Sequence, residues 1–189
     1  MSQPSQLSLG RIHGAFMTKR PSSHDEKIDT LIAEELLDDV IGWLKASGDE
    51  DPDRDEVRKS LESAMDFEDD GYKIARQLDN DGWDVDAELV HILDNAFPNR
   101  IRIHRDFVAK WVEENGIKPT FEVGQTVAFK ERNKSHTGEI TRINEKQAEY
   151  TIYCAEMGHV REGTGSHGVI LPFEAVSIPE ESVEPCPTT

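Results

Sequence analysis

The chain of 189 residues lacks the sequence features of a membrane or secreted protein. It has no apolar run near the about 18 residues of a membrane-spanning helix, and residues 1–23 lack the apolar core of a secretory signal. There are only two cysteines, Cys154 in a strand-like run and Cys186 in a Pro-rich tail, and together they make a poor disulfide framework. These absences predict a cytoplasmic protein without a membrane contact.

Catalytic and cofactor motifs are also missing. The sequence contains no Walker loop, dinucleotide fingerprint, nucleophile elbow or HExxH helix. His136, Cys154, His159 and His167 fall in one predicted domain, but they do not have the close paired spacing of a zinc site. The acidic turns do not follow the ligand order of a calcium-binding EF-hand. We therefore predict no catalytic residue, no metal and no cofactor; an enzyme with an unrecognised site is the third-ranked alternative.

Basic residues are scarce in one long stretch of the chain. Residues 25–97 hold 24 of the 38 acidic residues and only 7 of the 21 basic ones, so this stretch alone accounts for the net charge of −17. The rest of the chain is electrically balanced. A surface this acidic disfavours sequence-independent binding to nucleic acid and favours a basic partner.

Apolar residues at helical spacing predict a helical domain over residues 24–117. We expect helices over 23–46, 51–67, 72–79, 83–97 and 107–115. Ser23 and Asp51 are the expected caps of the first two helices, and Pro98 is expected to end the fourth. Ile101 and Ile103 alternate with polar residues, which predicts a short extended segment. Because the loops are short, the helices should pack as an antiparallel bundle.

From residue 121 the apolar pattern changes to a period of two, which is typical of strands. Five short strands are expected over 126–129, 138–143, 148–155, 168–171 and 175–178. The segments VGQTVAF, HTGEITRINEKQAEYTIY and GVILPFEAV resemble a small SH3-like β-barrel of the KOW or Tudor kind. The resemblance covers residues 121–178 and implies a barrel that closes its own edges and binds proteins, peptides or nucleic acid. The expected class is therefore α+β, an acidic helical bundle followed by a five-stranded SH3-like barrel.

The two ends of the chain are predicted to be disordered. Residues 1–23 are rich in Ser, Gln and Pro, which predicts a mobile basic arm. A more specific hypothesis is that this arm folds back on the acidic residues 25–97 or binds a partner. Residues 179–189 form an acidic tail containing Pro.

The first functional hypothesis is a non-catalytic interaction protein whose acidic helical domain binds a basic protein. In a stricter form, the carboxylates mimic nucleic-acid phosphates, as in an inhibitor encoded by a phage or mobile element. The candidate acidic face consists of Asp38, Asp39, Asp49, Glu50, Asp51, Glu68, Asp69, Asp70, Asp79 and Asp81. The alternative hypothesis is that these acidic residues have no binding role and only make the protein soluble.

The second hypothesis is a nucleic-acid-associated protein that uses the barrel. The loop between its first two strands is basic, and together with one later arginine it forms a candidate ligand rim. The rim residues are Lys130, Arg132, Lys134 and Arg142. This hypothesis expects all four on one open edge, beside exposed aromatics such as Phe129 or Tyr153.

Overall fold

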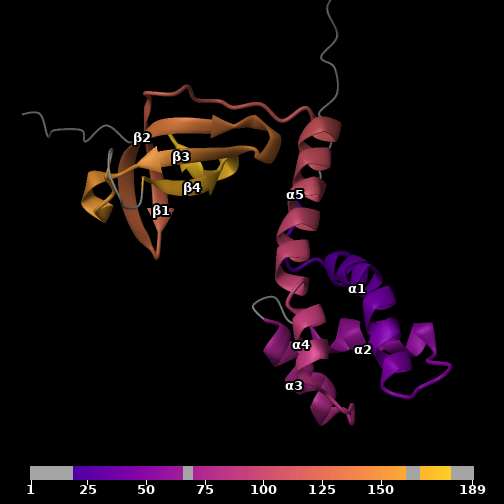
Figure 1. The fold of residues 1–189 in the computed structure, drawn as a ribbon. Coiled ribbons are helices and arrows are strands. Elements are labelled where there is room, and N and C mark those ends of the chain that lie inside the picture. The colour runs from indigo at the N-terminus through magenta and orange to yellow at the C-terminus, as the bar shows by residue number, and fades with distance from the viewer. Residues whose placement is uncertain (1–18, 66–69, 161–166, 180–189) are drawn as a thin grey trace, which may run out of the picture.

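The structure is a computed structural model and describes residues 19–65, 70–160 and 167–179. Its class is α+β: helices are gathered at one end and a curled antiparallel sheet at the other, with one long helix running between them (Figure 1). The helices are α1 (Glu26–Ala46), α2 (Arg54–Ala64), α3 (Gly71–Asn80), α4 (Ala87–Leu93) and α5 (Ala96–Asn115). The strands are β1 (Thr126–Glu131), β2 (Lys134–Asn144), β3 (Glu149–Tyr153), β4 (Val169–Pro172) and β5 (Val176–Ser177). Within these ranges, no helix has the length and apolarity needed to cross a membrane.

An aspartate begins each of the first four helices. Asp25, Asp53, Asp70 and Asp86 each accept hydrogen bonds from backbone N–H groups in the first turn, which the helix itself leaves unpaired. The caps predicted for the first two helices are wrong by two residues, because Asp25 and Asp53 hold the extended backbone and the side-chain contacts of an N-cap. Four acidic residues of this domain therefore stabilise the N-termini of helices.

The prediction is wrong over the fourth and fifth helices. Pro98 lies in the first turn of α5, where its missing N–H is not needed, and α4 already ends at Leu93. The predicted extended segment is helical. Arg100 and Ile103 are buried and Ile101 is exposed, as a helical period of three to four residues requires.

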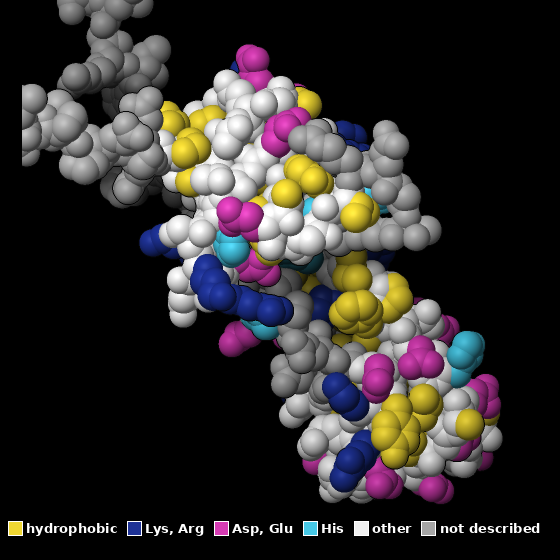
Figure 2. All heavy atoms as spheres, turned by 90° about the vertical axis from the view of Figure 1, so that its left-hand side faces the viewer, with side chains coloured by type: hydrophobic (Ala, Val, Ile, Leu, Met, Phe, Trp, Pro, Cys, Tyr) yellow, Lys and Arg dark blue, Asp and Glu magenta, His cyan; other side chains and the backbone are white. Residues whose placement is uncertain are grey.

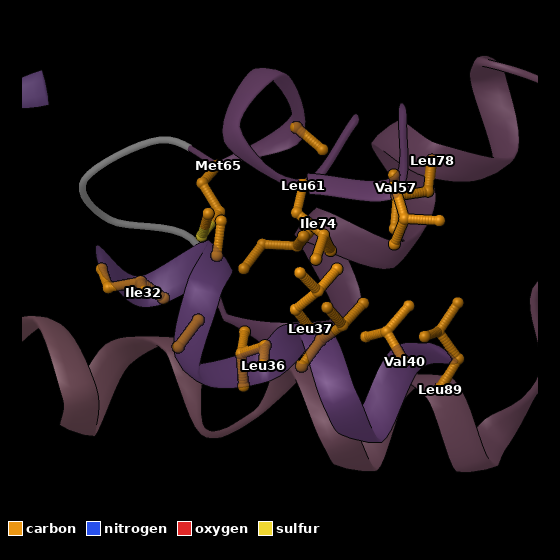
Figure 3. Close-up of a cluster of buried hydrophobic side chains, with 14 of the residues drawn as sticks. Ile32, Leu36, Leu37, Val40, Val57, Leu61, Met65, Ile74, Leu78 and Leu89 are labelled. Atoms are coloured by element: carbon orange, nitrogen blue, oxygen red, sulfur yellow. The ribbon is translucent and has the colours of Figure 1, made fainter. Parts of the chain in front are cut away.

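The helical core is built around α1. Its apolar residues occur at helical spacing, so one face meets the three shorter helices at once. Figure 3 shows this cluster, in which Ile32, Leu36, Leu37 and Val40 of α1 lie against Val57, Leu61, Met65, Ile74, Leu78 and Leu89. A fully buried side chain of this kind contributes about 1.5–3 kcal/mol, so short helices that are half polar become stable together.

The sheet has the strand order β4-β3-β2-β1-β5, with all neighbours antiparallel. A two-residue turn joins β1 to β2, and both of its residues, Arg132 and Asn133, have positive φ angles of 46° and 64°, as a tight hairpin requires. β5 has two residues and pairs with β1. No ladder in the described segments joins β4 to β5, so the sheet is a curled half-barrel rather than the closed barrel predicted.

Helix α5 contributes to both hydrophobic cores. Ala96 and Ile103 in its first half belong to the helical core, whereas Val108 and Trp111 in its second half pack in the core of the sheet. The helical core and the core of the sheet therefore share this helix. The long linking helix in Figure 1 is the physical connection between them.

Of the disordered arm predicted over residues 1–23, residues 1–18 lie outside the described residues, and residues 19–23 lie against α5 and the sheet. The Arg20 guanidinium donates to Gln147 O at 2.8 Å and Ala148 O at 3.2 Å. It also pairs with Glu149 at 3.4 Å and lies 5.9 Å from the centre of the Trp111 ring. These contacts hold the start of the described chain at the junction of the two cores.

Candidate functional site

A groove opens at one end of the helical domain, where α1 ends, α2 begins and the turn between α3 and α4 passes. Its volume is about 430 Å³. We call it the acidic groove, and its lining residues are Trp43, Leu44, Ser47, Asp49, Pro52, Asp53, Glu56, Val57, Ser60, Gly82, Trp83 and Asp84. The lining thus combines carboxylates and aromatic rings and includes no Lys or Arg.

Four carboxylates line the acidic groove: Asp49, Asp53, Glu56 and Asp84. Asp53 is occupied as the N-cap of α2, and Asp49 accepts a hydrogen bond from the N–H of Asp51 at 3.3 Å. Glu56 and Asp84 are exposed, and no ion pair within the described residues includes any of the four. Their negative charges therefore add in a small space, which attracts a cation.

Two tryptophans form an aromatic wall of the acidic groove. The rings of Trp43 and Trp83 are parallel within 3°, with centroids 6.4 Å apart. The indole N–H of Trp43 donates to Asp86 Oδ1 at 3.0 Å, which fixes this ring to the start of α4. Trp43 is only 5% exposed, whereas Trp83 is half-buried, so Trp83 offers most of the accessible aromatic surface.

The predicted acidic face divides into groups. Glu68 and Asp69 lie outside the described residues, and the other members are all exposed. Asp49 lines the acidic groove itself, and Glu50, Asp51 and Asp81 are sequence neighbours of lining residues. Asp39 is on α1, Asp79 is near the end of α3, Asp70 caps α3, and Asp38 pairs with Arg54 at 2.7 Å.

Sequence reasoning missed three lining carboxylates, Asp53, Glu56 and Asp84, and both tryptophans. A signal was present, since Trp43 lies in the last turn of the helix that precedes one acidic turn and Trp83 lies within another. The fold adds what spacing along the chain does not show, because it brings the turn after α1 to the turn after α3.

Arginines neutralise a different acidic face, on α1. The ion pairs are Glu34–Arg58 at 3.3 Å, Asp38–Arg54 at 2.7 Å and Glu35–Arg102. The hydrogen bond that Arg58 donates to Glu62 raises the pKa of Arg58 above its usual value. The bond from Arg102 to Glu35 likewise raises the pKa of Arg102, so both arginines keep their charge. This face is therefore less suited to a basic partner than the acidic groove.

Figure 2 shows one face of the molecule, with the sheet above and the helical lobe below. Acidic side chains surround the visible edge of the helical lobe, and hydrophobic side chains are exposed between them. Among the exposed apolar residues of this domain are Tyr72, 65% exposed, and Phe97, 47% exposed. Acidic and apolar surface thus occur together on the helical domain.

The predicted basic rim is not one patch. Lys130, Arg132 and Lys134 are exposed at the β1–β2 hairpin end. Arg142 lies eight residues beyond Lys134 on β2, which is roughly 26 Å at about 3.3 Å per residue. The expectation of an exposed Phe129 beside this rim is wrong, because that ring is 3% exposed and packs in the core of the sheet.

Arg142 lies instead in a second basic region at the junction of α5 and the sheet. Together with Arg105 of α5 and Lys146 it lines a pocket of about 450 Å³. Glu149 is the acidic residue of that lining, so the pocket carries a net positive charge. This combination was not visible in the sequence, because Arg105 belongs to the helical part of the chain.

The histidines and the cysteine of the sheet domain are partly brought together. His136, Cys154 and Glu156 have potential ligand atoms within 4.8 Å of one another. His159 accepts a hydrogen bond at Nδ1 from the Cys154 N–H, at 3.1 Å, and His167 lies at hydrogen-bond distance from a backbone carbonyl. His136 and Glu156 also line a pocket of about 810 Å³.

Comparison with known proteins finds no protein-family model, no curated protein and no solved structure that matches this chain. The resemblance of residues 121–178 to SH3-like barrels therefore has no support from a matching family. A function for this chain must therefore be inferred from the geometry of the surfaces described above.

Proposed function

We propose that this chain is a non-catalytic interaction protein that binds a basic protein partner through the acidic groove. One observation carries the proposal: four carboxylates and a pair of parallel tryptophans line a single groove that includes no Lys or Arg. An arginine or lysine side chain of the partner fits this chemistry, because the carboxylates attract its charge and an aromatic face stabilises a cation.

Long-range attraction supports the same partner. The carboxylates around the groove belong to the stretch that carries the whole net charge of −17. Such a field speeds the encounter with a basic surface and makes the association sensitive to salt. In the stricter form of the proposal, the partner is itself a nucleic-acid-binding protein and the chain is a phage or mobile-element inhibitor that competes with nucleic acid.

The test uses the full chain and two peptides of equal length, one rich in arginine and one rich in glutamine. Binding is followed by tryptophan fluorescence at low and high salt. The arginine-rich peptide should bind and be released by salt, and the glutamine-rich peptide should not bind. The groove variant combines Asp49→Asn, Glu56→Gln and Asp84→Asn, and should weaken binding by about 1–3 kcal/mol, or roughly 5- to 150-fold.

A matched variant separates the groove from net charge. Glu113→Gln, Glu122→Gln and Glu145→Gln remove the same number of charges from exposed positions outside the helical core. If the proposal is right, this variant keeps most of the affinity of the unmodified chain. Equal losses of affinity in the two variants would show that only overall charge attracts the peptide. The acidic groove would then be excluded as the binding site.

A second candidate function is nucleic-acid association through the sheet, and one observation favours it. Arg105, Arg142 and Lys146 line one pocket, which suits a phosphate group better than the separated rim residues do. The test is whether the full chain binds single-stranded nucleic acid and loses this binding when the three residues are replaced with Gln. That result would favour nucleic-acid association over the first function.

We also infer that the curled half-barrel is an open form of the SH3-like barrel of the KOW or Tudor kind, in which β4 and β5 form the two unpaired edges of the described sheet. The antiparallel succession β1 to β4, with β5 returning to pair with β1, supports this assignment. Small barrels of this kind bind several classes of ligand, so the assignment is compatible with either function.

A further inference from the structure

Three side chains with metal-binding chemistry meet on the sheet. His136 is on β2, Cys154 directly follows β3, and Glu156 is on the short 3-10 helix Ala155–Met157. One potential ligand atom from each lies within 4.8 Å of the others. We propose that these residues bind a divalent transition-metal ion, and that zinc fits the donor set best.

The donor chemistry selects the class of metal. A thiolate, an imidazole nitrogen and a carboxylate oxygen are all zinc ligands, whereas calcium and magnesium take oxygen ligands almost alone. Cys154 is a free thiol and is 1% exposed. The pocket beside His136 and Glu156 supplies a route for the ion to the buried thiol.

A buried nitrogen without a hydrogen-bond partner supports the same metal site. Nδ1 of His136 is buried and has no hydrogen-bond partner in the described part of the chain. Glu156 Oε2 lies 3.7 Å from this nitrogen, which is too far for a hydrogen bond. A buried nitrogen without a partner is destabilising, and an ion held between these two atoms removes the penalty.

The neighbouring histidine is a positioning residue and not a ligand. Nδ1 of His159 accepts the backbone N–H of Cys154, so the ring proton of neutral His159 is on Nε2. This contact fixes the main chain that carries the thiol. The protein therefore supplies three ligands and leaves the fourth tetrahedral position to water.

Binding requires a small closure of the cluster. Ligand atoms around tetrahedral zinc are about 3.3–3.8 Å apart, so a pair at the observed limit of 4.8 Å must close by roughly 1 Å. Glu156 is able to move toward the other two ligands, because its side chain is 74% exposed.

The test titrates the full chain, freed of metal and of any histidine tag, with Co²⁺ and then with Zn²⁺. We expect one Co²⁺ per chain, a thiolate-to-cobalt charge-transfer absorption band, and displacement of cobalt by Zn²⁺. Cys154→Ser should abolish the band, and His136→Gln and Glu156→Gln should each weaken binding at least about 10-fold. Cys186→Ser, which removes the other thiol, should leave the band unchanged.

Glu156→Gln keeps the test decisive if the buried variants fail to fold, because its side chain is exposed and its circular dichroism should match the parent chain. The proposal is overturned if no charge-transfer band forms. It is equally overturned if the band depends on Cys186 instead of Cys154, or if neither His136→Gln nor Glu156→Gln weakens binding. The proposal does not depend on the acidic groove, so the peptide assay is not expected to respond to these variants.

Discussion

Replacing Asp86 with alanine should destabilise the helical core and loosen the aromatic wall of the acidic groove. Its Oδ1 atom accepts hydrogen bonds from the N–H groups of Glu88 at 3.0 Å and Leu89 at 2.9 Å. The same atom accepts the indole N–H of Trp43 at 3.0 Å. One carboxylate thus begins α4 and holds a ring that stacks on Trp83.

The expected magnitude follows from these contacts. Loss of an N-cap costs about 1 kcal/mol. Leaving a buried donor unsatisfied costs about 1–3 kcal/mol more, and the lower part of that range applies because the Trp43 bond is only partly buried. We therefore expect Asp86→Ala to lower the free energy of unfolding of the helical core by about 2–3 kcal/mol.

The assay is urea unfolding of the full chain, followed by tryptophan fluorescence and by far-UV circular dichroism. A Trp111→Phe background leaves Trp43 and Trp83 as reporters, both in the helical core. This matters because two cores joined by one helix need not unfold in a single transition. The control is Asp86→Asn, which keeps an oxygen acceptor at the cap and should cost less than about 1 kcal/mol.

A double-mutant cycle with Trp43→Phe isolates the side-chain bond from the cap. If the bond contributes as described, the two single changes are not additive, since both remove the same contact. A free energy of unfolding for Asp86→Ala within about 0.5 kcal/mol of the parent would refute the reasoning. It would mean that neither the cap nor the indole bond stabilises this end of the domain.

Two further predictions concern stability and use the same unfolding assay. Gly71→Ala should cost about 1–3 kcal/mol or more, because an added Cβ would lie 2.5 Å from the backbone of Val90 in α4 and of Asp94 directly after it. Gly42→Ala, with nothing within 4 Å, should be neutral or stabilising. Equal effects of the two changes would contradict the close approach at Gly71. Arg100→Met should cost about 3 kcal/mol, because Arg100 is 5% exposed and its loss leaves Asp29 unpaired. Arg102→Met removes two exposed pairs, with Glu35 and Asp106, and should cost less than about 1 kcal/mol. Similar losses for the two arginines would exclude a special role for the buried one.

Much of the architecture was predictable because it depends on local pattern. The α+β class, the helical first half and the five strands follow from apolar periods of three to four residues and of two. Element boundaries were less predictable. The observed N-caps of α1 and α2 lie two residues after the predicted ones. Several Asp and Ser residues compete for each cap position, and only the backbone geometry selects one.

The error around α5 has a different cause. A short run of alternating residues such as Arg100 to Ile103 fits a strand or a helix equally well over so few positions. Burial of Arg100 against Asp29 of α1 decides for the helix, and that contact joins residues 71 positions apart. Long-range pairing of this kind leaves no local pattern in the sequence.

The sequence by itself determined the charge distribution, the two classes of secondary structure and the scarcity of catalytic motifs. The tertiary structure decided which of the many acids share a groove and that α5 joins two cores. It also brought His136, Cys154 and Glu156 together and moved Arg142 away from the hairpin. The physical reason is that a site is a set of distances between side chains, and chain folding sets those distances where sequence spacing does not.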